Sequence, residues 1–348
     1  MLGGGVFVTQ NKTLPGSYVN FVSLNYTTSY LGERGVVAIA LPLGKSKGNV
    51  IELTRLEFVA NSSTLLGISA DSAKAAPIRE IFKNANKLYI YDLGSGDSLE
   101  TVSSAISAFE SYEFNILCAY TDVAEDITTY ITAIKSWRDE LGKKCQLVVY
   151  DQTKPDYEGI INVVSTVSDA GAPDYALVAW VAGAEAGCEI SKSCTNMLYN
   201  GEYKVVTNKT QTQLEGCING GQIAFHLVYG EVRLLEDVNS LTTTSSDKGD
   251  DFKYNQTIRV IDQIANDIAK LFNTKFLGKI PNNASGRVSL WADIVAHHRE
   301  LESIEAIENF DSTLLTVEQG NTKKSVVVND AITVINSMAQ LYLTVVVS

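Results

Sequence analysis

Val36-Val-Ala-Ile-Ala-Leu41 is an unbroken run of apolar residues with no polar position in it. A strand that is covered on both faces has this composition, and such strands are typical of a parallel sheet lying between helices. Similar runs recur at 87–91, 115–120, 146–150 and 175–181. Segments with apolar residues at helical spacing lie between them. The alternation predicts an α/β fold with a three-layer, Rossmann-like, mostly parallel sheet.

The segments between these strands carry the signals of helices. A helix is predicted over 72–84, a second starts with Ser98 as its cap, and a third follows Asp122 and ends at Gly142. A short helix is also expected near 157–164. Each of these helices lies between two consecutive predicted strands, as a layered α/β sheet requires.

The second half of the chain has a different pattern. Residues 258–272 place isoleucine, leucine and phenylalanine three or four positions apart, which predicts a long amphipathic helix. A further helix is expected over 289–308. Short strands are expected at 223–229, 231–236, 313–317 and 325–328. Because strands and helices do not alternate here, this half is predicted to be α+β.

The two ends of the chain carry uncharged, strand-forming residues. Residues 341–348 read Leu-Tyr-Leu-Thr-Val-Val-Val-Ser, and residues 3–10 and 14–22 open the chain in a similar way. Terminal residues are usually poorly ordered, and an apolar strand with an open edge promotes aggregation. Two such strands predict pairing with neighbouring copies by strand addition. Because the donor and acceptor surfaces differ, the contact builds rings or filaments. We therefore expect an assembly protein.

These observations predict four parts of the chain and the residues that contact neighbouring subunits. The predicted parts are an N-terminal β-arm (1–24), an α/β core part (25–183), an α+β part (184–338) and a C-terminal β-arm (339–348). The residues expected to exchange strands between subunits are Val6, Phe7, Val8, Tyr18, Val19, Leu341, Tyr342, Leu343, Val345, Val346 and Val347.

Composition excludes several classes of protein. The 28 Lys and Arg residues against 40 Asp and Glu residues leave a net charge of −12, which argues against nucleic acid or an anionic membrane as the main partner. No apolar run approaches the ~18 residues that a membrane span needs, and the N-terminal residues lack the features of a signal peptide. The five cysteines have no C-x-x-C spacing, which favours reduced thiols over a disulfide framework or a zinc site.

One turn offers an alternative function. Gly94-Ser-Gly96 follows a predicted strand and precedes a helix, where a dinucleotide fingerprint would lie. However, Leu99 stands where the third glycine belongs, and the next strand ends Cys118-Ala-Tyr120 without an acidic residue. The alternative is a Rossmann-like nucleotide-binding enzyme, and the favoured interpretation is a tight turn without a cofactor.

The histidines give little support for a metal or a catalytic site. Asp293, His297 and Glu300 could share one helix face and form half of a metal site. No H-E-x-x-H pattern occurs, no serine lies in a nucleophile elbow, and packing explains His298. The sequence therefore predicts no catalytic, cofactor-binding or metal-binding residues, and no enzyme.

The sequence resembles the contractile tail sheath proteins of myophages and R-type bacteriocins (tailocins), in particular the PBSX-like type of Gram-positive bacteria. The matching blocks follow the family order along nearly the whole chain. They are Pro15–Tyr18, Glu33–Gly35, Trp180–Ala184, Thr210–Glu215, Glu236–Asn239, Asn255–Asp262, Pro281–Asn283 with Gly286-Arg287, Ala306–Phe310 and Met338–Val347.

The resemblance implies a mechanical role. Such subunits form helically stacked hexameric rings around an inner tail tube, between a baseplate and a tail terminator protein. Their arms add strands to a neighbour's sheet. Contraction drives the tube through a cell envelope without ATP, from the energy difference between two packings of the same subunits. The expected location is the bacterial host cytoplasm during assembly, and the phage tail or tailocin particle after lysis. A static shell or tube protein stays open as an alternative.

Two further expectations follow from the resemblance. Many relatives insert a β-rich outer domain between the strand that ends at Leu93 and the strand at Asn115, whereas this chain has only one predicted helix there. It therefore resembles a minimal sheath protein. The inner tube is expected to contact isolated charges on the two C-terminal helices, and the candidates are Lys270, Lys275, Lys279, Glu300 and Glu305, with Glu308 beside them.

Overall fold

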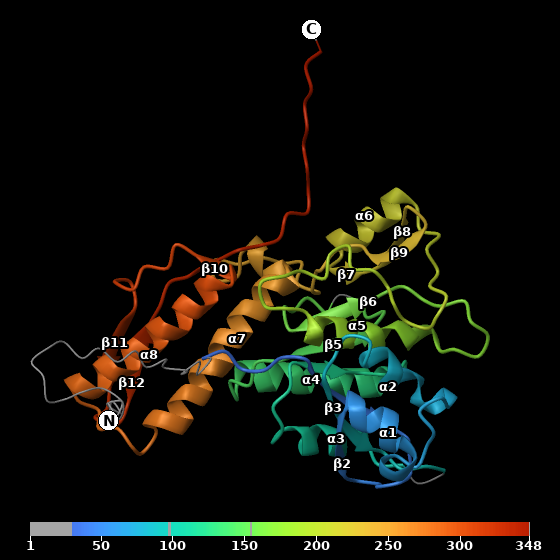
Figure 1. Cartoon of the computed structure of the whole chain (residues 1–348), viewed down its shortest axis with the longest axis horizontal. Coiled ribbons are helices and arrows are strands. Elements are labelled where there is room, and N and C mark those ends of the chain that lie inside the picture. Colours follow the sequence, from blue (N-terminus) through green and yellow to red (C-terminus); the bar gives the residue numbers. More distant parts are fainter. Residues whose placement is uncertain (1–29, 97–98, 154, 348) are drawn as a thin grey trace, which may run out of the picture.

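A computed structural model describes residues 30–96, 99–153 and 155–347. Its centre is a seven-stranded sheet of order β2-β3-β1-β4-β5-β6-β7 (Figure 1). The strands are β1 (Val36–Leu41), β2 (Val50–Thr54), β3 (Lys87–Asp92), β4 (Ile116–Cys118), β5 (Gln146–Tyr150), β6 (Ile160–Val163) and β7 (Gln222–Ile223). β2 runs antiparallel to β3, and the other neighbours pair in parallel. The predicted mostly parallel α/β sheet is confirmed.

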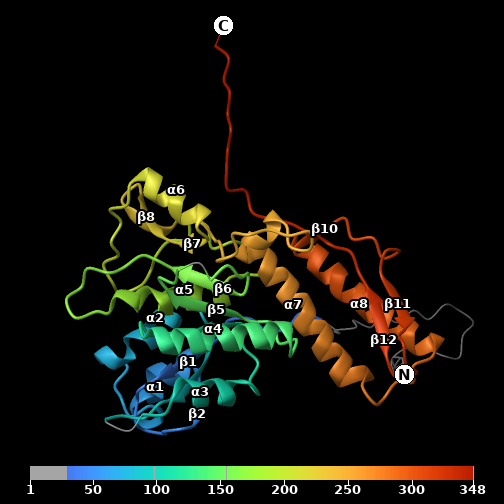
Figure 2. The same cartoon turned by 180° about the vertical axis from the view of Figure 1, so that it is seen from behind.

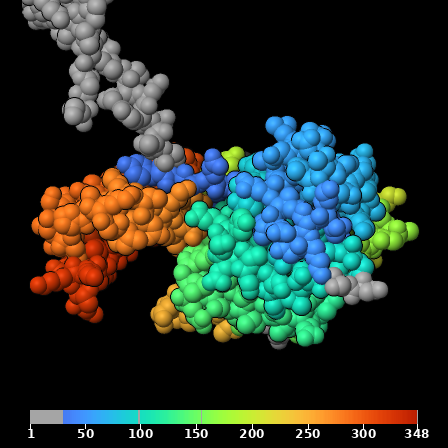
Figure 3. All heavy atoms as spheres, turned by 90° about the horizontal axis from the view of Figure 1, so that it is seen from below, coloured from blue at the N-terminus to red at the C-terminus, as the bar shows by residue number. Residues whose placement is uncertain are grey.

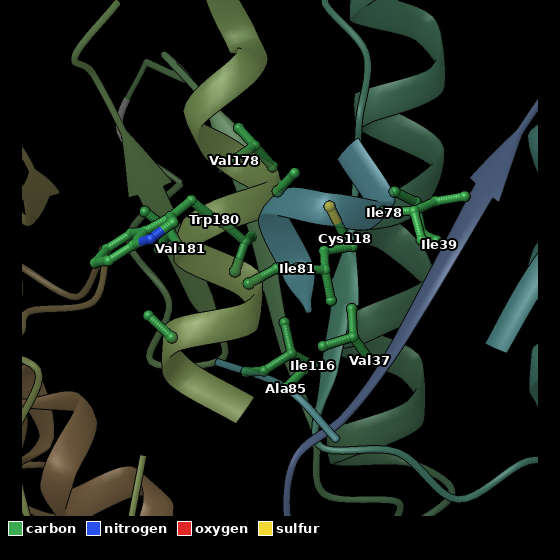
Figure 4. Close-up of a cluster of buried hydrophobic side chains, with 14 of the residues drawn as sticks. Val37, Ile39, Ile78, Ile81, Ala85, Ile116, Cys118, Val178, Trp180 and Val181 are labelled. Atoms are coloured by element: carbon green, nitrogen blue, oxygen red, sulfur yellow. The ribbon is translucent and has the colours of Figure 1, made fainter. Parts of the chain in front are cut away.

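The sheet is the middle of three layers because its strands are apolar on both faces. Val37 and Ile39 of β1 pack with α2 (Ala76–Ile81) and α5 (Leu177–Gly187), as the close-up in Figure 4 shows. Residues of the opposite face, such as Ala38, pack with the aromatic and aliphatic side chains of two other helices. These helices are α3 (Val102–Phe109) and α4 (Ala124–Asp139). Alternate side chains of one strand thus enter two separate cores.

Two predicted elements have the wrong type. Residues 175–181 form a short 3₁₀ turn and the start of α5 instead of a strand, and β6 lies where a short helix was expected near 157–164. Ten of the eleven residues of α5 are buried, so the helix has no polar face. An apolar run of this length does not distinguish a buried helix from a buried strand, because neither shows periodicity.

Other elements differ in extent. Ser98 lies outside the described residues, and Thr101 caps α3 by accepting a hydrogen bond from Ser104 N–H at 3.2 Å. Strand β2, helix α1 (Arg55–Leu65) and helix α6 (Gln211–Asn219) were not predicted. Among the described residues between β3 and β4, α3 is the only helix or strand, as expected for a chain without the outer domain.

The C-terminal part is a helix pair with small sheets, as predicted. Helix α7 (Asn255–Leu271) continues as a π-helical turn (Phe272–Phe276), and α8 (Ala284–Ser303) runs back antiparallel to it. Each small sheet has two antiparallel strands, which are β8 (Phe225–Val228) with β9 (Glu231–Leu234), β11 (Thr316–Gln319) with β12 (Val326–Asn329), and β10 (Ile307–Glu308) with β13 (Thr333–Val334). Figures 2 and 3 show this helix pair standing to one side of the α/β body.

The helix pair has a core of its own. Val260 of α7 and Leu290, Ile294 and Leu301 of α8 are buried together with Phe310.

No helix in the described parts of the chain is both long and apolar enough to cross a membrane. The domain boundaries given above stay predictions.

Candidate functional site

The C-terminal arm is an exposed, extended chain. It leaves the body beyond β13 and runs straight away from it, as Figures 1 and 2 show. Residues 335–347 belong to no hydrogen-bonded strand among the described residues. The predicted strand-exchange residues in this arm are each at least 71% exposed. They are Leu341, Tyr342, Leu343, Val345, Val346 and Val347. Those of the N-terminal arm, Val6, Phe7, Val8, Tyr18 and Val19, lie outside the described residues.

The root of this arm is fixed to the first turn of α7. The side-chain amide of Gln256 donates to Ile335 O at 3.1 Å and accepts from Ser337 N–H at 2.9 Å. Beside it, Thr257 Oγ1 donates to Asn336 Oδ1 at 3.2 Å. Because three consecutive residues are held by two neighbours on one helix, the arm is anchored up to Ser337 and exposed from Met338 onward.

The N-terminal half of α7, which anchors the arm, is also fixed to the α/β body by buried polar contacts. Arg259 Nη2 lies 2.6 Å from Glu185 Oε2 on α5 and 3.3 Å from Asp237 Oδ2. Asn255 Oδ1 accepts from Gln146 Nε2 on β5 at 2.9 Å. We call this cluster the polar joint, and its members are Arg138, Gln146, Glu185, Asp237, Asn255, Gln256, Arg259 and Asp262.

Two carboxyl groups of the polar joint, those of Glu185 and Asp237, share one proton. Burial, and then the neighbouring Asp237, raise the pKa of Glu185 well above its ordinary value. Burial would also raise the pKa of Asp237, but the charge of Arg259 and a hydrogen bond from Glu185 hold that pKa below its ordinary value. Glu185 Oε1 and Asp237 Oδ1 are otherwise buried without a partner. A proton on Glu185 satisfies both oxygens, so Asp237 and Arg259 form the ion pair.

This cluster also resembles a metal site in its residue types. Ligand atoms of Glu185, Cys194 and Asp237 lie within 4.8 Å of one another and are buried. However, Arg259 Nη2 lies within hydrogen-bonding distance of both carboxylates and 3.9 Å from Cys194 Sγ. The guanidinium group therefore already supplies the positive charge that a cation would bring. The geometry suits a structural ion pair and does not suit a metal ion.

The predicted half-site on α8 does not converge. Asp293 Oδ2 accepts from Lys275 Nζ at 2.5 Å, and His297 Nε2 lies 3.1 Å from Asp267 Oδ2 on α7. Glu300 Oε2 accepts from Tyr30 N–H at 2.7 Å. Each of the three residues thus has a different partner, and these contacts hold α7, α8 and residue 30 together.

The turn at Gly94–Gly96 is filled by a carboxylate. β1 pairs with β3 on one side and β4 on the other, so the ends of these strands form the switch point where open α/β sheets bind ligands. There, Asp92 accepts hydrogen bonds from the backbone N–H groups of Leu43, Gly44, Ser46 and Gly94 at 2.6–3.2 Å.

These bonds disfavour a phosphate beside Gly94. Burial alone would raise the pKa of Asp92, but the four N–H donors lower it below its ordinary value. Gly94 N–H and three N–H groups of residues 43–46 are therefore bonded to an ionised side chain, which also repels an anion. The nucleotide-binding alternative finds no support.

The candidate tube-contact residues lie on the two C-terminal helices and just beyond them. Lys270, Lys275 and Lys279 are at the C-terminal end of α7 and just beyond it, and Lys275 is paired with Asp293. Glu300 lies in the last turn of α8, and Glu305 follows the end of that helix. Their role in tube contact stays a prediction.

The sequence did not reveal the polar joint. Apolar spacing identified one stripe of α7, but Gln256, Arg259 and Asp262 on its other sides are buried as well. Their partners, such as Arg138 and Glu185, are more than 70 positions away, so no local pattern links them. The only signal was that Asn255–Asp262 is one of the blocks that resemble tail sheath proteins.

The sequence of this chain is similar to proteins of a phage-like element and of a phage. XkdK of phage-like element PBSX, from Bacillus subtilis 168, is 26% identical over 254 residues, which are 69% of this chain and 54% of XkdK. This chain therefore spans about half the length of that relative. The tail sheath protein of Clostridium phage phiCD119 is 24% identical over 304 residues, 84% of this chain and 82% of the phage protein.

Solved structures share the fold. The sheath tail protein of Desulfitobacterium hafniense is 24% identical, with a TM-score of 0.77 over 94% of this chain and 99% of that one. A subunit of the contracted helical sheath of the anti-feeding prophage is 14% identical, with a TM-score of 0.71 over 97% of this chain and 99% of that one.

Two family models match the sequence in succession. The phage tail sheath protein central domain matches residues 97–240, which contain α3 to β9, and the phage tail sheath C-terminal domain matches residues 247–348, which contain the helix pair and the arm. Together the two matches cover more than half of the chain, from the α/β body to the exposed arm, and the chain therefore belongs to the phage tail sheath protein family.

Proposed function

We propose that this chain is the repeating subunit of a contractile tail sheath. It polymerises as helically stacked hexameric rings around an inner tail tube, and contraction drives the tube through a cell envelope. Family membership supports this proposal, and the observation that carries it is the uncharged C-terminal arm, which is exposed along its length and anchored at Gln256. An apolar strand of this kind in a lone subunit needs an acceptor, and another copy of the chain supplies it.

The acceptor is a small sheet of a neighbouring subunit. The β11–β12 hairpin has only two strands, and a sheet of this size is marginally stable without more strands or a packed face. It packs on α8 but leaves Val327 and Val328 of β12 exposed. Addition of the neighbour's residues 341–347 covers these valines and pairs the open strand edge. Each backbone hydrogen bond contributes about 1 kcal/mol, and the contacts add up over a lattice of linked subunits.

The polar joint transmits force between arm and body. A pull on the arm acts on residues 335–337, then on Gln256 and Thr257, and then through Arg259 and Asp262 on the α/β body. Several ion pairs and hydrogen bonds in one buried cluster must break together before the arm separates from the body. Rigid subunits linked by exposed arms are suited to a lattice that changes its packing without unfolding its members.

The partners follow from this role. They are other copies of the chain, an inner tail tube protein, a baseplate and a tail terminator protein. Assembly takes place in the bacterial host cytoplasm, and the finished particle is a phage tail or a tailocin. Lys270, Lys275, Lys279, Glu300 and Glu305 are the proposed tube contacts. Exposed ion pairs each contribute well below about 1 kcal/mol, so such a contact is released easily during contraction.

Electron microscopy of the purified full-length chain tests assembly. Striated hollow tubes are expected, and the chain without Leu341–Ser348 is expected to stay a folded monomer in size-exclusion chromatography. Tubes formed by the truncated chain would show that the arm is not the connector. A truncated chain that unfolds would show that the arm belongs to the subunit's own core.

Contraction is tested on assembled particles. The extended state is proposed to be kinetically trapped, so mild acid, urea or heat converts it to a shorter form without nucleotide. A static shell would keep its length under these conditions, and a need for ATP or a return to the long form in buffer would exclude stored lattice energy as the source.

A further inference from the structure

Residues 30–34 form a strap that lies against α7 before the chain enters β1, and Figure 3 shows these first blue atoms beside the orange helix pair. Gly32 N–H donates to Asp267 Oδ1 on α7 at 3.0 Å, and Gly32 O accepts from Gln263 Nε2 at 3.3 Å. Arg34 Nη1 donates to Gln263 Oε1 at 3.3 Å. The strap is therefore anchored on α7 by Gln263 and Asp267.

The same face of α7 also holds the C-terminal arm. Gln256, which anchors residues 335–337, lies seven positions before Gln263 and eleven positions before Asp267. These spacings are close to two and three full helical turns, so the three side chains form one line, and its ends are about 16 Å apart. The three side chains are polar, yet each is at most 6% exposed. The anchors of both chain ends thus lie along one side of a single helix.

The contacts that fasten α7 to the α/β body lie on a different side of this helix. Arg259 and Asp262 project about a quarter turn away from the line of Gln256, Gln263 and Asp267. They pair with Glu185 on α5 and Arg138 on α4. The anchors of the two chain ends and the connection to the body are therefore separate sets of contacts on one helix.

We propose that α7 is a tie between the two chain ends, which carries a load applied to one end directly to the other. The load enters α7 at Gln256 from residues 335–337 and passes at Gln263 and Asp267 to the strap. Because all these anchors lie on one helix, the central sheet is not part of this path. The polar joint holds the α/β body on the tie, and it carries load when one chain end alone is pulled.

The anchor at Asp267 is braced by the second helix. The Asp267 carboxylate accepts from Gln263 Nε2 at 2.9 Å and lies 3.1 Å from His297 Nε2 on α8. Hydrogen bonds to a carboxylate are stronger than those between neutral groups, so the contact with Gly32 N–H is a firm one. Within α7, the backbone hydrogen bonds run along the helix axis and resist extension in that direction.

The strap approaches α7 too closely for a larger residue at position 32. A Cβ on Gly32 would lie 2.7 Å from Asp267 Oδ1 and 3.1 Å from Gln263 Nε2. Gly32→Ala therefore presses against both anchor side chains and weakens the strap, while no buried side chain of the body is changed. Gly249→Ala is the matched control, because no atom beyond its two chain neighbours lies within 4 Å of the added Cβ.

The use of this tie in a lattice rests on the proposed function. Arms that pair with different neighbours connect those neighbours through one helix of the subunit between them. The α/β bodies, which hang on the tie at the polar joint, can then change their positions while the connection between neighbours persists.

Optical tweezers test the tie on the full-length monomer, pulled by handles at Met1 and Ser348. Short extensions are expected first, as residues 30–34 and 335–337 are released from α7, and a long extension follows when the α/β body unfolds. Gly32→Ala is expected to shift one short extension to lower force, and Gln256→Ala the other, whereas Gly249→Ala shifts neither. Ile90→Val, in the fully buried part of β3, is expected to lower the force of the long extension and leave the short ones unchanged.

Three results would overturn the proposal. These are an unaltered protein whose first extension is already the unfolding of the body, equal release forces in Gly32→Ala and Gly249→Ala, or short extensions that shift to lower force in Ile90→Val. The unaltered protein and Gly32→Ala decide the question even if a core variant does not fold. All traces come from the monomer, so a failure to form tubes counts against the proposed function and not against the tie.

Discussion

Arg138 of α4 and Asp262 of α7 form a bidentate ion pair, with Nη1 2.5 Å from Oδ2 and Nη2 2.8 Å from Oδ1. The two residues are 124 positions apart, and both are buried. Arg138 Nη1 also donates to Cys145 O at 2.8 Å, at the start of β5. One side chain therefore connects the second helical layer, the central sheet and the C-terminal helix pair. The α/β body and the helix pair are fastened at this point by charge as well as by apolar packing.

Removal of one partner of this pair is expected to destabilise the protein strongly. Asp262→Ala leaves the Arg138 charge buried without a partner, which typically costs about 3–5 kcal/mol of unfolding free energy. Urea unfolding followed by circular dichroism measures the loss. Glu231→Gln is the control, because it removes the partly exposed pair with Arg233 and should cost at most about 1 kcal/mol. Equal effects of the two substitutions would contradict the role assigned to the buried pair.

Two glycines in helices should respond to alanine in opposite directions. A Cβ on Gly183 of α5 would lie 2.3 Å from Ile81 O and 2.9 Å from Ile81 Cα, so α2 and α5 would have to separate. Gly183→Ala is expected to destabilise the protein by about 1–3 kcal/mol. Beyond the adjoining residues and the backbone of the helix itself, no atom lies within 4 Å of the same position on Gly216 of α6. Gly216→Ala should stabilise the protein by roughly 0.5–1 kcal/mol through helix propensity. Thermal unfolding of both variants checks this, and a shift of the same sign in both would refute it.

Glu185 should make stability depend on pH. Its pKa is raised in the folded state, so the folded protein binds a proton that the unfolded chain has released above its ordinary pKa of 4.5. Stability from this group is therefore present at low pH and falls as pH rises above that value, by at most about 1.4 kcal/mol per pH unit. Glu185→Gln, which keeps a neutral hydrogen-bond donor toward Asp237, is expected to flatten this decline. Urea midpoints from about pH 5 to about pH 8 measure the effect.

The exposed Glu189 supplies the matched control for this pH profile. It lies in the turn after α5 and pairs with Lys192 at the surface. Glu189→Gln is expected to leave the pH profile of stability unchanged. If Glu185→Gln and the unaltered protein had parallel profiles, Glu185 would not carry the shared proton.

Proline in the arm should block assembly without affecting the monomer. Val345 and Val346 are exposed and make no strand contact within the described chain, so Val345→Pro and Val346→Pro are expected to leave the unfolding transition unchanged. N–H groups of adjacent residues point to opposite sides of a strand, so at least one of the two substitutions removes a donor to the neighbouring subunit. Val346→Thr keeps the N–H group and is the control. Electron microscopy should find tubes with Val346→Thr, and tubes with both proline variants would rule out strand addition by these residues.

Much of the α/β core could be predicted from the sequence, for a physical reason. Strands β1, β3 and β5 are apolar runs bounded by turns, and α7 has an apolar stripe at helical spacing, so local pattern and burial agree. The prediction went wrong at α5, where helix and strand would both be apolar on all sides. It also missed β2, whose Glu52 and Thr54 are exposed at the antiparallel edge of the sheet.

By itself, the sequence determined the alternating α/β architecture, the long C-terminal helices and the apolar character of the chain ends, because each of these depends on residues close together in the chain. Only the tertiary structure decided that Arg138 meets Asp262, that Arg259 lies between Glu185 and Asp237, and that Gln256 anchors the arm. These pairs join distant segments through buried charges and amides. Whether such a group faces solvent or a partner depends on how the helices pack against the sheet, and no local spacing of residues encodes that packing.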